Sequence, residues 1–206
     1  AQNAVVPGTS GIRRLVDIAV ALTATAIVLP LMALAAAGIA LGMGRAVLFT
    51  QIRAGKDNHP FRMVKFRSMT DARDASGRLL PDAARLTALG RFLRRSRIDE
   101  LPELWNILKG EMSLIGPRPL LPETIEAMGA QGIRRGLVRP GLTGWAQVNG
   151  NARLDECDKL ALDLWYIDRR SLWLDLRIIL RTIGVIFVGD RINRSVIGRE
   201  YAGGHR

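Results

Sequence analysis

The sequence is poor in the residues on which disulfide-bonded and zinc-binding proteins depend. Of its 206 residues, one is a cysteine, Cys157, and two are histidines, His59 and His205. A single cysteine cannot form an intramolecular disulfide, so a disulfide framework is excluded, and a cysteine-rich zinc module is excluded as well. With so few histidines, a metal site built on histidine is not expected.

Acidic residues are also scarce, since 19 Asp and Glu stand against 30 Lys and Arg and give a net charge of +11. This excess favours an anionic partner, either a polyanion such as nucleic acid or a phosphate-bearing substrate, or the surface of an anionic membrane. Hydrophobic residues nevertheless make up 48% of the chain. That share is enough to bury a core, so intrinsic disorder is excluded as the main state.

Charge is absent altogether from Ile18 to Gly44, a run rich in Ala, Leu, Ile and Val that is as long as a membrane segment. Pro30 lies near its middle, and an interior proline removes a helix hydrogen bond, so we predict a sharp break there. Each half then reaches about mid-membrane. Because arginines flank both ends, the pattern favours a re-entrant helix that leaves by the face it entered, over a kinked spanning helix and over a buried helix of a soluble protein.

The chain as a whole is predicted to have an α+β fold, mainly helical with a few short strands. Strands are expected at Val47 to Gln51 and Phe61 to Phe66, with a polar loop over residues 70–82. Helices are expected at residues 83–97, 100–108, 123–131, 155–167 and 172–188; the first is basic and amphipathic, and the last has the pattern of an interfacial helix. We therefore expect a membrane-associated segment, residues 1–45, and one integrated domain, residues 46–206.

The stretch Asp99-Glu100-Leu101-Pro102 joins two carboxylates to a proline. Because a helix tolerates proline in its first turn, Pro102 predicts a helix that starts near Asp99. Carboxylates there are stabilised by the positive end of the helix dipole, and free N–H groups at the same end can bind phosphate. The simpler alternative is that Asp99 caps the helix and Glu100 complements its dipole.

Several cations are predicted on short, stiff segments near this pair. Lys65 and Arg67 lie where a predicted strand ends, Arg118 lies between two prolines, and Arg139 precedes Pro140. Proline restricts the backbone, so such cations are held at a low entropic cost. Each one alone could be a solvated or lipid-facing side chain, but together with the acidic pair they favour a phosphate-binding site.

A later acidic residue, Asp163, shares a predicted helix face with Lys159 and Tyr166. The spacing favours an ion pair between Asp163 and Lys159 over a role for Asp163 in the site. The sequence contains no Walker loop, no complete G-x-G-x-x-G fingerprint and no recognisable nucleophile and base pair for a catalytic triad.

Taken together, these blocks resemble the bacterial sugar transferase family, the monotopic phosphoglycosyl transferases, and the resemblance covers nearly the whole chain. The blocks are Arg13-Arg14-Leu15-Val16-Asp17, the apolar segment with Pro30, Phe49-Thr50-Gln51, Lys65-Phe66-Arg67-Ser68-Met69, Asp99-Glu100-Leu101-Pro102, Gly116-Pro117-Arg118-Pro119, Arg139-Pro140-Gly141, Gly144-Trp145-Ala146-Gln147-Val148-Asn149-Gly150 and Leu172-Trp173-Leu174-Asp175-Leu176. The length is similar to the minimal catalytic form, without the additional N-terminal membrane helices of larger members.

The resemblance implies transfer of a phosphosugar from a nucleotide diphosphosugar, usually a UDP-sugar, to a polyprenyl phosphate such as undecaprenyl phosphate. UMP is released, and the product begins a surface or extracellular glycoconjugate. The family's nucleophilic aspartate, which forms an aspartyl phosphosugar intermediate, falls on Asp99, and its partner glutamate on Glu100. Mg²⁺ is the expected cofactor, with these two carboxylates as ligands. Substrate binding is expected from Lys65, Arg67, Arg118, Arg139, Gln147 and Asp163.

The resemblance also implies a location and a set of partners. The chain is expected at the cytoplasmic face of the bacterial inner membrane, with the lipid bilayer as a partner, possible homodimerisation and no nucleic acid. One stretch departs from the family's pattern, in which an Arg-Asn pair follows the Asn-Gly and a Trp comes later. Here Asn151 and Ala152 follow Gly150, and Glu156 stands at the position of the Trp.

Two alternatives remain open from the sequence. One is a membrane transferase that reacts directly in a ternary complex, with Asp99 as a metal ligand. The other is a non-catalytic, membrane-anchored basic module that binds anionic lipid or nucleic acid.

Overall fold

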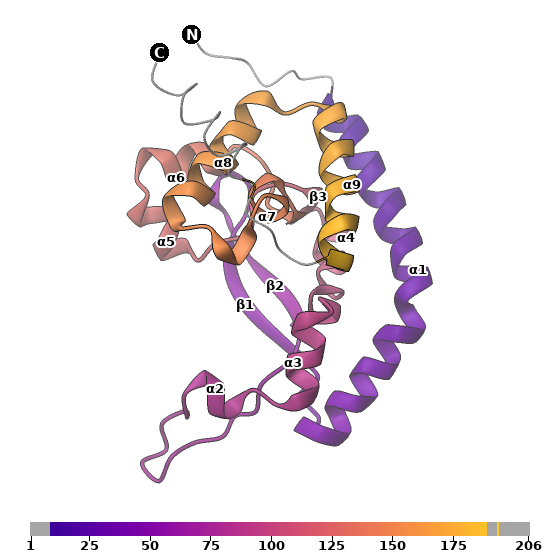
Figure 1. Cartoon of the computed structure of the whole chain (residues 1–206), viewed down its shortest axis with the longest axis vertical. Coiled ribbons are helices and arrows are strands. Elements are labelled where there is room, and N and C mark those ends of the chain that lie inside the picture. Colours follow the sequence, from indigo (N-terminus) through magenta and orange to yellow (C-terminus); the bar gives the residue numbers. More distant parts are fainter. Residues whose placement is uncertain (1–8, 189–192, 194–206) are drawn as a thin grey trace.

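The computed structural model describes residues 9–188 and 193; His205 and nearly all of the tail beyond Arg191 lie outside the described residues. A long N-terminal helix, α1 (Thr9–Met43), bows along one side of a body made of two small sheets and several shorter helices (Figure 1). The body begins with a hairpin and ends with helices α8 (Glu156–Arg169) and α9 (Leu172–Val188). The mainly helical fold with a few short strands is as predicted.

Helix α1 is continuous through Pro30, so the sharp break predicted there does not interrupt the helix. Figure 1 shows α1 as one curved element. An interior proline removes a single backbone hydrogen bond and bends a helix without necessarily ending it, which is consistent with a gradual curve. The stretch Gly11–Met43 is long and apolar enough to cross a membrane, judged by length and composition.

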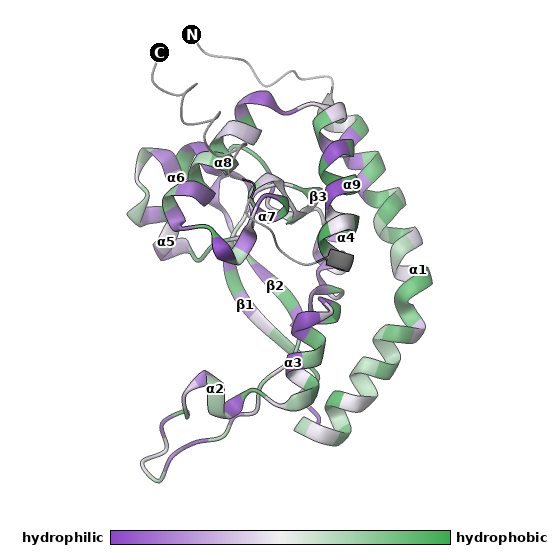
Figure 2. Cartoon of the chain, in the orientation of Figure 1, coloured by the Kyte–Doolittle hydropathy of each residue, from purple (hydrophilic) through white to green (hydrophobic). Residues whose placement is uncertain are grey.

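One face of α1 packs against the body, and the rest of it does not. Ala21 packs in a cluster with Phe61 and Met63 of the hairpin. Ile39 packs with Phe66 of the hairpin and with Leu93 of the helix α3 (Ala88–Arg95). The outward face carries exposed apolar side chains, including Ile27, Leu29, Leu34 and Leu41. Figure 2 shows the ribbon of α1 in green or pale green over most of its length. A surface of this size and composition is typical of a membrane contact.

Five hydrogen bonds from three side chains fasten the N-terminal part of α1 to the body. Arg13 Nε donates to Asp175 Oδ2 of α9 at 2.7 Å, and Arg14 donates to the carbonyls of Ile107 and Leu108 at 2.6 and 2.8 Å. Asp17 Oδ1 accepts from the backbone N–H of Leu114 at 2.9 Å and from the Ser113 hydroxyl at 3.0 Å. Together with the packing of Ile39, these contacts hold both ends of α1 to the same body.

The hairpin consists of strands β1 (Leu48–Ala54) and β2 (Pro60–Phe66), paired antiparallel with Leu48 opposite Phe66. A short turn, η1 (Lys56–Asn58), connects them. The sequence predicted both strands, although β1 runs three residues further than expected. Their alternating apolar residues explain the success, since Phe61 and Met63 are buried on one face.

The basic helix predicted at residues 83–97 is divided in the structure. Helix α2 (Asp82–Arg85) and the preceding polar loop form an arm that extends from the body, and α3 (Ala88–Arg95) packs against α1 (Figure 1). Thr87 separates the helices because its hydroxyl accepts from the N–H of Gly90 at 2.9 Å and so caps α3.

The helix predicted to start near Asp99 begins later. Asp99 and Glu100 lie on a short 3₁₀ turn, η2 (Ile98–Glu100), and the α-helix α4 (Glu103–Lys109) starts after Pro102. The acidic pair therefore does not occupy the N-terminus of an α-helix, and the phosphate site predicted from free helix N–H groups is not formed in that way.

The second sheet was not predicted at all. Strands β3 (Ser113–Ile115) and β4 (Gly141–Thr143) pair in parallel and bring two Gly- and Pro-containing loops together. Between them lie α5 (Pro122–Ala127) and α6 (Ala130–Arg135), where one helix was expected. After β4 come α7 (Trp145–Val148) and the turn η3 (Asn151–Arg153), followed by α8 and α9, which match the predicted helices closely.

Candidate active site

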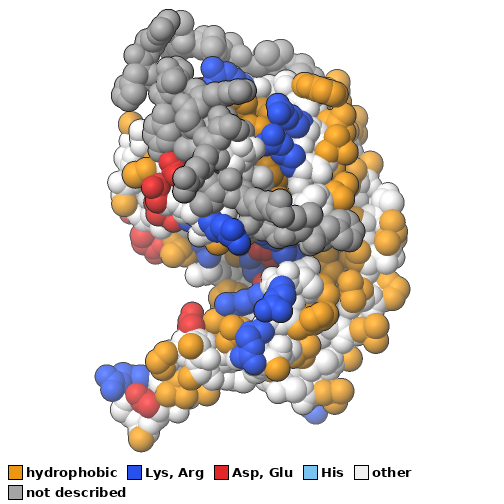
Figure 3. All heavy atoms as spheres, viewed as in Figure 1, with side chains coloured by type: hydrophobic (Ala, Val, Ile, Leu, Met, Phe, Trp, Pro, Cys, Tyr) orange, Lys and Arg blue, Asp and Glu red, His pale blue; other side chains and the backbone are white. Residues whose placement is uncertain are grey.

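A cleft of about 1270 Å³ opens between the arm, the hairpin and the C-terminal helices. Figure 3 shows Lys and Arg side chains gathered around the hollow in this face of the molecule. The residues of the cleft wall that carry charge include Lys65, Arg67, Arg94, Arg97, Arg118, Asp99 and Glu100. The structure thus brings both residues of the acidic pair and three of the four predicted loop cations to one cavity.

Asp99 is 9% exposed and lies on η2. The residue that leads into this turn, Arg97, has a φ of 57°, in the left-handed region that non-glycine residues rarely adopt. Asp99 Oδ1 has no hydrogen-bond partner among the described residues. Burial raises the pKa of the Asp99 carboxyl, and the neighbouring Glu100 raises it further, while Lys65 and Arg94 act in the opposite direction.

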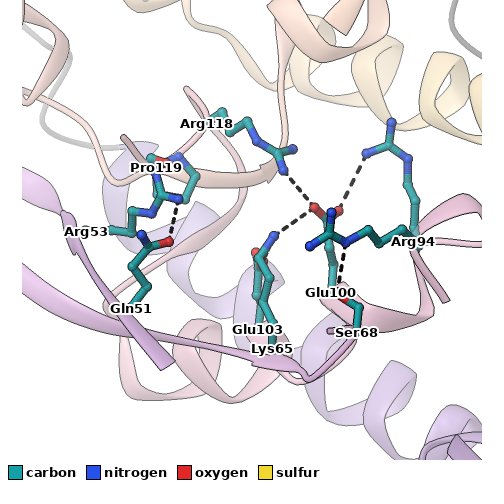
Figure 4. A network of polar contacts seen from close by, with 10 residues as sticks. Gln51, Arg53, Lys65, Ser68, Arg94, Glu100, Glu103, Arg118 and Pro119 are labelled. Carbon is teal, nitrogen blue, oxygen red and sulfur yellow. Dashed lines mark hydrogen bonds and ion pairs between the residues drawn. The ribbon is translucent and has the colours of Figure 1, made fainter. Parts of the chain in front are cut away.

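Glu100 stands in contrast to Asp99, because cations surround it. Its Oε1 lies 3.0 Å from Lys65 Nζ and 2.9 Å from Arg118 Nη2, and its Oε2 lies 3.5 Å from Arg97 Nη1. Figure 4 shows the side chains of Lys65 and Arg118 both pointing at this carboxylate. Burial alone would raise the pKa of Glu100, but the charges of Arg118 and Lys65 lower it to about 2.

A third carboxyl group, Glu103, belongs to the site and was missed in the sequence. Its Oε1 lies 3.0 Å from Lys65 Nζ, so Lys65 bridges Glu100 and Glu103. Glu103 is almost fully buried, and burial raises its pKa to about 7 despite the charge of Lys65. The sequence signal that was overlooked is the three-residue spacing from Glu100, which on a helix places two side chains on one face.

The loop that carries Arg118 is held by the second sheet. The N–H of Gly116 donates to Thr143 O at 2.9 Å, and the N–H of Gly141 donates to Pro117 O at 2.9 Å. A Cβ atom on Gly116 would lie 2.4 Å from the carbonyl oxygen of Arg139, so glycine is required for the two loops to approach this closely. The Pro-Arg-Pro segment is therefore stiff, as the sequence predicted.

Two further predicted site residues, Arg67 and Arg139, differ in whether they line the cleft. Arg67 lines the cleft, but its guanidinium donates to the carbonyls of Met69 and Met43 at 2.8 and 3.2 Å and pairs with Asp71. Arg139 is not among the residues that line the cleft; its Nε donates to Gly110 O at 2.8 Å, beyond the end of α4. Arg139 therefore binds the backbone just after α4 in this structure.

Gln147 and Asp163 both line the cleft and are both buried. Neither the Oε1 nor the Nε2 atom of Gln147 has a hydrogen-bond partner among the described residues, so the amide is available to a ligand. The predicted ion pair between Asp163 and Lys159 is wrong. Asp163 Oδ2 pairs with Arg135 at 2.8 Å, whereas Lys159 pairs with Glu156 at 2.7 Å.

Comparison with known proteins identifies related chains. A family model for bacterial sugar transferases matches residues 8–189. The sugar transferase EpsL of Bacillus subtilis (strain 168), whose name describes it as uncharacterized, is 46% identical over 157 residues, or 76% of this chain and 78% of the relative.

Two further relatives carry names that state a reaction. The undecaprenyl-phosphate glucose phosphotransferase of Komagataeibacter xylinus is 46% identical over 169 residues, or 75% of this chain and 32% of that protein. The UDP-N-acetylgalactosamine-undecaprenyl-phosphate N-acetylgalactosaminephosphotransferase of Aeromonas hydrophila is 40% identical over 186 residues, or 86% of this chain and 44% of that protein. The chain spans less than half the length of these two relatives.

The raised pKa of Glu103 predicts a pH-dependent stability. Because the folded chain holds this proton more tightly than the unfolded chain, whose carboxyl has an ordinary pKa of 4.5, stability is lost as the pH rises from that value through about 7. Glu103→Gln removes this loss. Between pH 5 and pH 8, we expect the wild type to lose about 2–3 kcal/mol more unfolding free energy than the variant. Chemical denaturation in detergent micelles at each pH measures this difference. Parallel pH curves for wild type and variant, like those expected for the exposed control Glu126→Gln, would show that Glu103 has an ordinary pKa.

Proposed function

Because the chain belongs to the bacterial sugar transferase family, we propose that it transfers a phosphosugar from a UDP-sugar to a polyprenyl phosphate such as undecaprenyl phosphate. The names of the relatives from K. xylinus and A. hydrophila describe reactions of this kind. The observation that carries the proposal is the arrangement in the cleft, where a buried carboxylate with a free oxygen stands beside a cluster of cations. The product would be a polyprenyl diphosphosugar, the first lipid-linked intermediate of a glycoconjugate.

The different surroundings of the two adjacent carboxyl groups support Asp99 as the nucleophile. Both oxygens of Glu100 lie close to cations, and its pKa of about 2 marks it as a weak base and a weak nucleophile. Asp99 has a free Oδ1, and its pKa is raised by burial and by the charge of Glu100. An aspartate is still ionised near neutral pH unless its pKa is raised by several units, so it needs no general base to attack phosphorus.

In the first step, an oxygen of Asp99 forms a bond to the phosphorus that carries the sugar. The bond between that phosphorus and the oxygen bridging the two phosphates breaks, and UMP leaves with the bonding electrons. The obstacle is repulsion between a carboxylate and a diphosphate. Lys65, Arg97 and Arg118 converge on Glu100 and outnumber it in charge, so the site stays positive and stabilises the charge that moves to the leaving UMP.

In the second step, a phosphate oxygen of the polyprenyl phosphate attacks the same phosphorus. The bond between Asp99 and phosphorus breaks, which restores the carboxylate and releases the polyprenyl diphosphosugar. No proton has to move in either step when the polyprenyl phosphate reacts as a dianion, and the described residues that line the cleft include cations and carboxylates but no histidine.

We also propose Mg²⁺ as the cofactor. Mg²⁺ keeps several of its waters and is commonly bound through one or two carboxylates together with substrate phosphates, so a cage of protein ligands is not required. Asp99 and Glu100 are the carboxylates in position to hold it, and Asp99 is the more available, because cations already lie close to both oxygens of Glu100. When bound, the ion supplies positive charge that stabilises the diphosphate.

We also propose a monotopic placement at the cytoplasmic face of the inner membrane, and the way helix α1 is attached supports the monotopic part of this proposal. Its N-terminal part is fastened by Arg13, Arg14 and Asp17, and its C-terminal part packs through Ile39 on the same body. A helix held at both ends by one body does not extend freely across a bilayer, whereas its exposed apolar face suits insertion from one side. The acceptor's phosphate lies at headgroup level, so this placement brings the cleft to its substrate.

The wall of the cleft is the part of the site that we expect to select the sugar. The names of the two relatives specify glucose and N-acetylgalactosamine. Three positions where the chain departs from the family's pattern, Asn151, Ala152 and Glu156, line the cleft together with Gln147. We propose that this wall contacts the sugar or the nucleotide base.

A turnover assay tests the reaction and the nucleophile together. Purified protein in detergent is incubated with a panel of radiolabelled UDP-sugars and Mg²⁺, with and without undecaprenyl phosphate. We expect UMP and a labelled lipid product with at least one sugar, near-complete loss of both with Asp99→Asn, and near-normal activity with the control Asp168→Asn, an exposed carboxylate paired with Arg134. Release of UDP in place of UMP, or full activity of Asp99→Asn, would contradict the proposal.

A labelling experiment tests the membrane placement. The exposed Cys157 is first replaced by serine, and single cysteines are then introduced at Gly11 and Gly42, which have open space around them. Because both ends of α1 are held by one body, we expect a membrane-impermeant maleimide to label both sites in vesicles of one orientation. Labelling of the two sites from opposite faces would establish a spanning helix.

A further inference from the structure

Arg135 joins two parts of the cleft that lie far apart in the sequence. It is a buried residue at the end of α6, and its Nε and Nη2 atoms lie 2.9 and 2.8 Å from Asp163 Oδ2 on α8. Its Nη2 also donates to the main-chain carbonyl of Arg118 at 2.5 Å. One guanidinium therefore contacts both a carboxylate of the C-terminal helices and the backbone of the Pro-Arg-Pro loop.

The composition of this loop limits how it can be held in place. Pro117 and Pro119 have no N–H group, so the segment is fastened largely through its carbonyl oxygens. The N–H of Gly141 holds Pro117 O, Arg53 Nη1 holds Pro119 O at 3.3 Å, and the N–H of Ala54 holds Leu120 O at 2.9 Å. The carbonyl of Arg118 itself is held by Arg135, at the residue whose side chain reaches Glu100.

Asp163 makes this arrangement stable. A guanidinium as buried as that of Arg135 is costly unless a carboxylate compensates its charge, and Asp163 does so from a position that is itself 3% exposed. The two contacts to Asp163 also fix the plane of the guanidinium, which sets the direction of the N–H that points at the loop. Asp163 thus acts on Arg118 through Arg135.

We propose that Arg135 and Asp163 are positioning residues that hold the Arg118 guanidinium on Glu100 and toward the diphosphate. This inference rests on the proposed function, and it assigns a part in the reaction to Arg135. It also gives Asp163 a role in holding the loop.

The experiment compares Arg135→Lys with a matched control, Arg134→Lys. Arg134 precedes Arg135 on α6 and also pairs with a carboxylate of α8, Asp168, but that pair is half exposed and does not involve the loop. Lysine at position 135 keeps the charge that Asp163 requires, so the fold is retained, but its single ammonium cannot replace the planar fork that spans both partners. We expect kcat/KM for the UDP-sugar to fall about tenfold or more for Arg135→Lys, with Tm close to that of wild type, and little change for Arg134→Lys.

A double-mutant cycle separates positioning from general stabilisation. Arg118→Ala removes the side chain that Arg135 is proposed to position, so Arg135→Lys should cause little further loss in that background. Equal losses from Arg135→Lys in the wild-type and Arg118→Ala backgrounds, or wild-type activity of Arg135→Lys, would overturn the proposal.

Hydrogen exchange provides a readout that does not depend on turnover. The amides of Gly141 and Ala54 donate to carbonyls of the loop region, so they should exchange faster in Arg135→Lys than in Arg134→Lys. Unchanged exchange would contradict the inference. Failure of the wild type to release UMP from any sugar would instead refute the proposed function, and the exchange comparison would still test the role of Arg135.

Discussion

The burial of two adjacent carboxyl groups, Asp99 and Glu100, is the constraint on which the rest of the site depends. A carboxylate that loses contact with water must be compensated by charge or hydrogen bonds, or its pKa rises. The structure compensates the two groups unequally. Lys65, Arg97 and Arg118 approach Glu100 and lower its pKa to about 2, whereas Asp99 retains a free oxygen and a raised pKa. The two carboxyl groups therefore differ: Glu100 binds three cations, and Asp99, which we propose as the nucleophile, keeps a free oxygen.

The scaffold brings those cations from elements that are distant in the sequence. Lys65 lies in β2 next to the end of the hairpin, Arg97 precedes the acidic turn, and Arg118 lies on a loop that the small parallel sheet holds in place. Helix α1 supports the same arrangement from outside, since Arg14 binds carbonyls in the last turn of α4, the helix that follows the acidic pair. The apolar helix α1 and the acidic pair therefore belong to one connected structure.

The sequence predicted what local pattern determines and missed what long-range contact determines. Alternating apolar residues revealed the hairpin, and the neighbouring prolines showed that Arg118 is rigidly held. The three-residue strands β3 and β4 are too short to show a pattern, and the partnership of Asp163 with Arg135 spans 28 positions. Helical spacing predicted an ion pair between Asp163 and Lys159, but Lys159 pairs with Glu156, one turn earlier on the same helix. Pro30 predicts a break because proline removes one helix hydrogen bond, yet the flanking turns continue the helix.

The central claim, that Asp99 reacts because it is left uncompensated while Glu100 is not, is tested most directly by trapping the first step. Protein incubated with a UDP-sugar that supports turnover, but without polyprenyl phosphate, is quenched in acid and its intact mass is measured, followed by mapping of the modified peptide. The account predicts a mass increase of one sugar phosphate, located on Asp99, which disappears when polyprenyl phosphate is added. A sugar phosphate on Glu100, or no adduct from protein that turns over when both substrates are present, would contradict it.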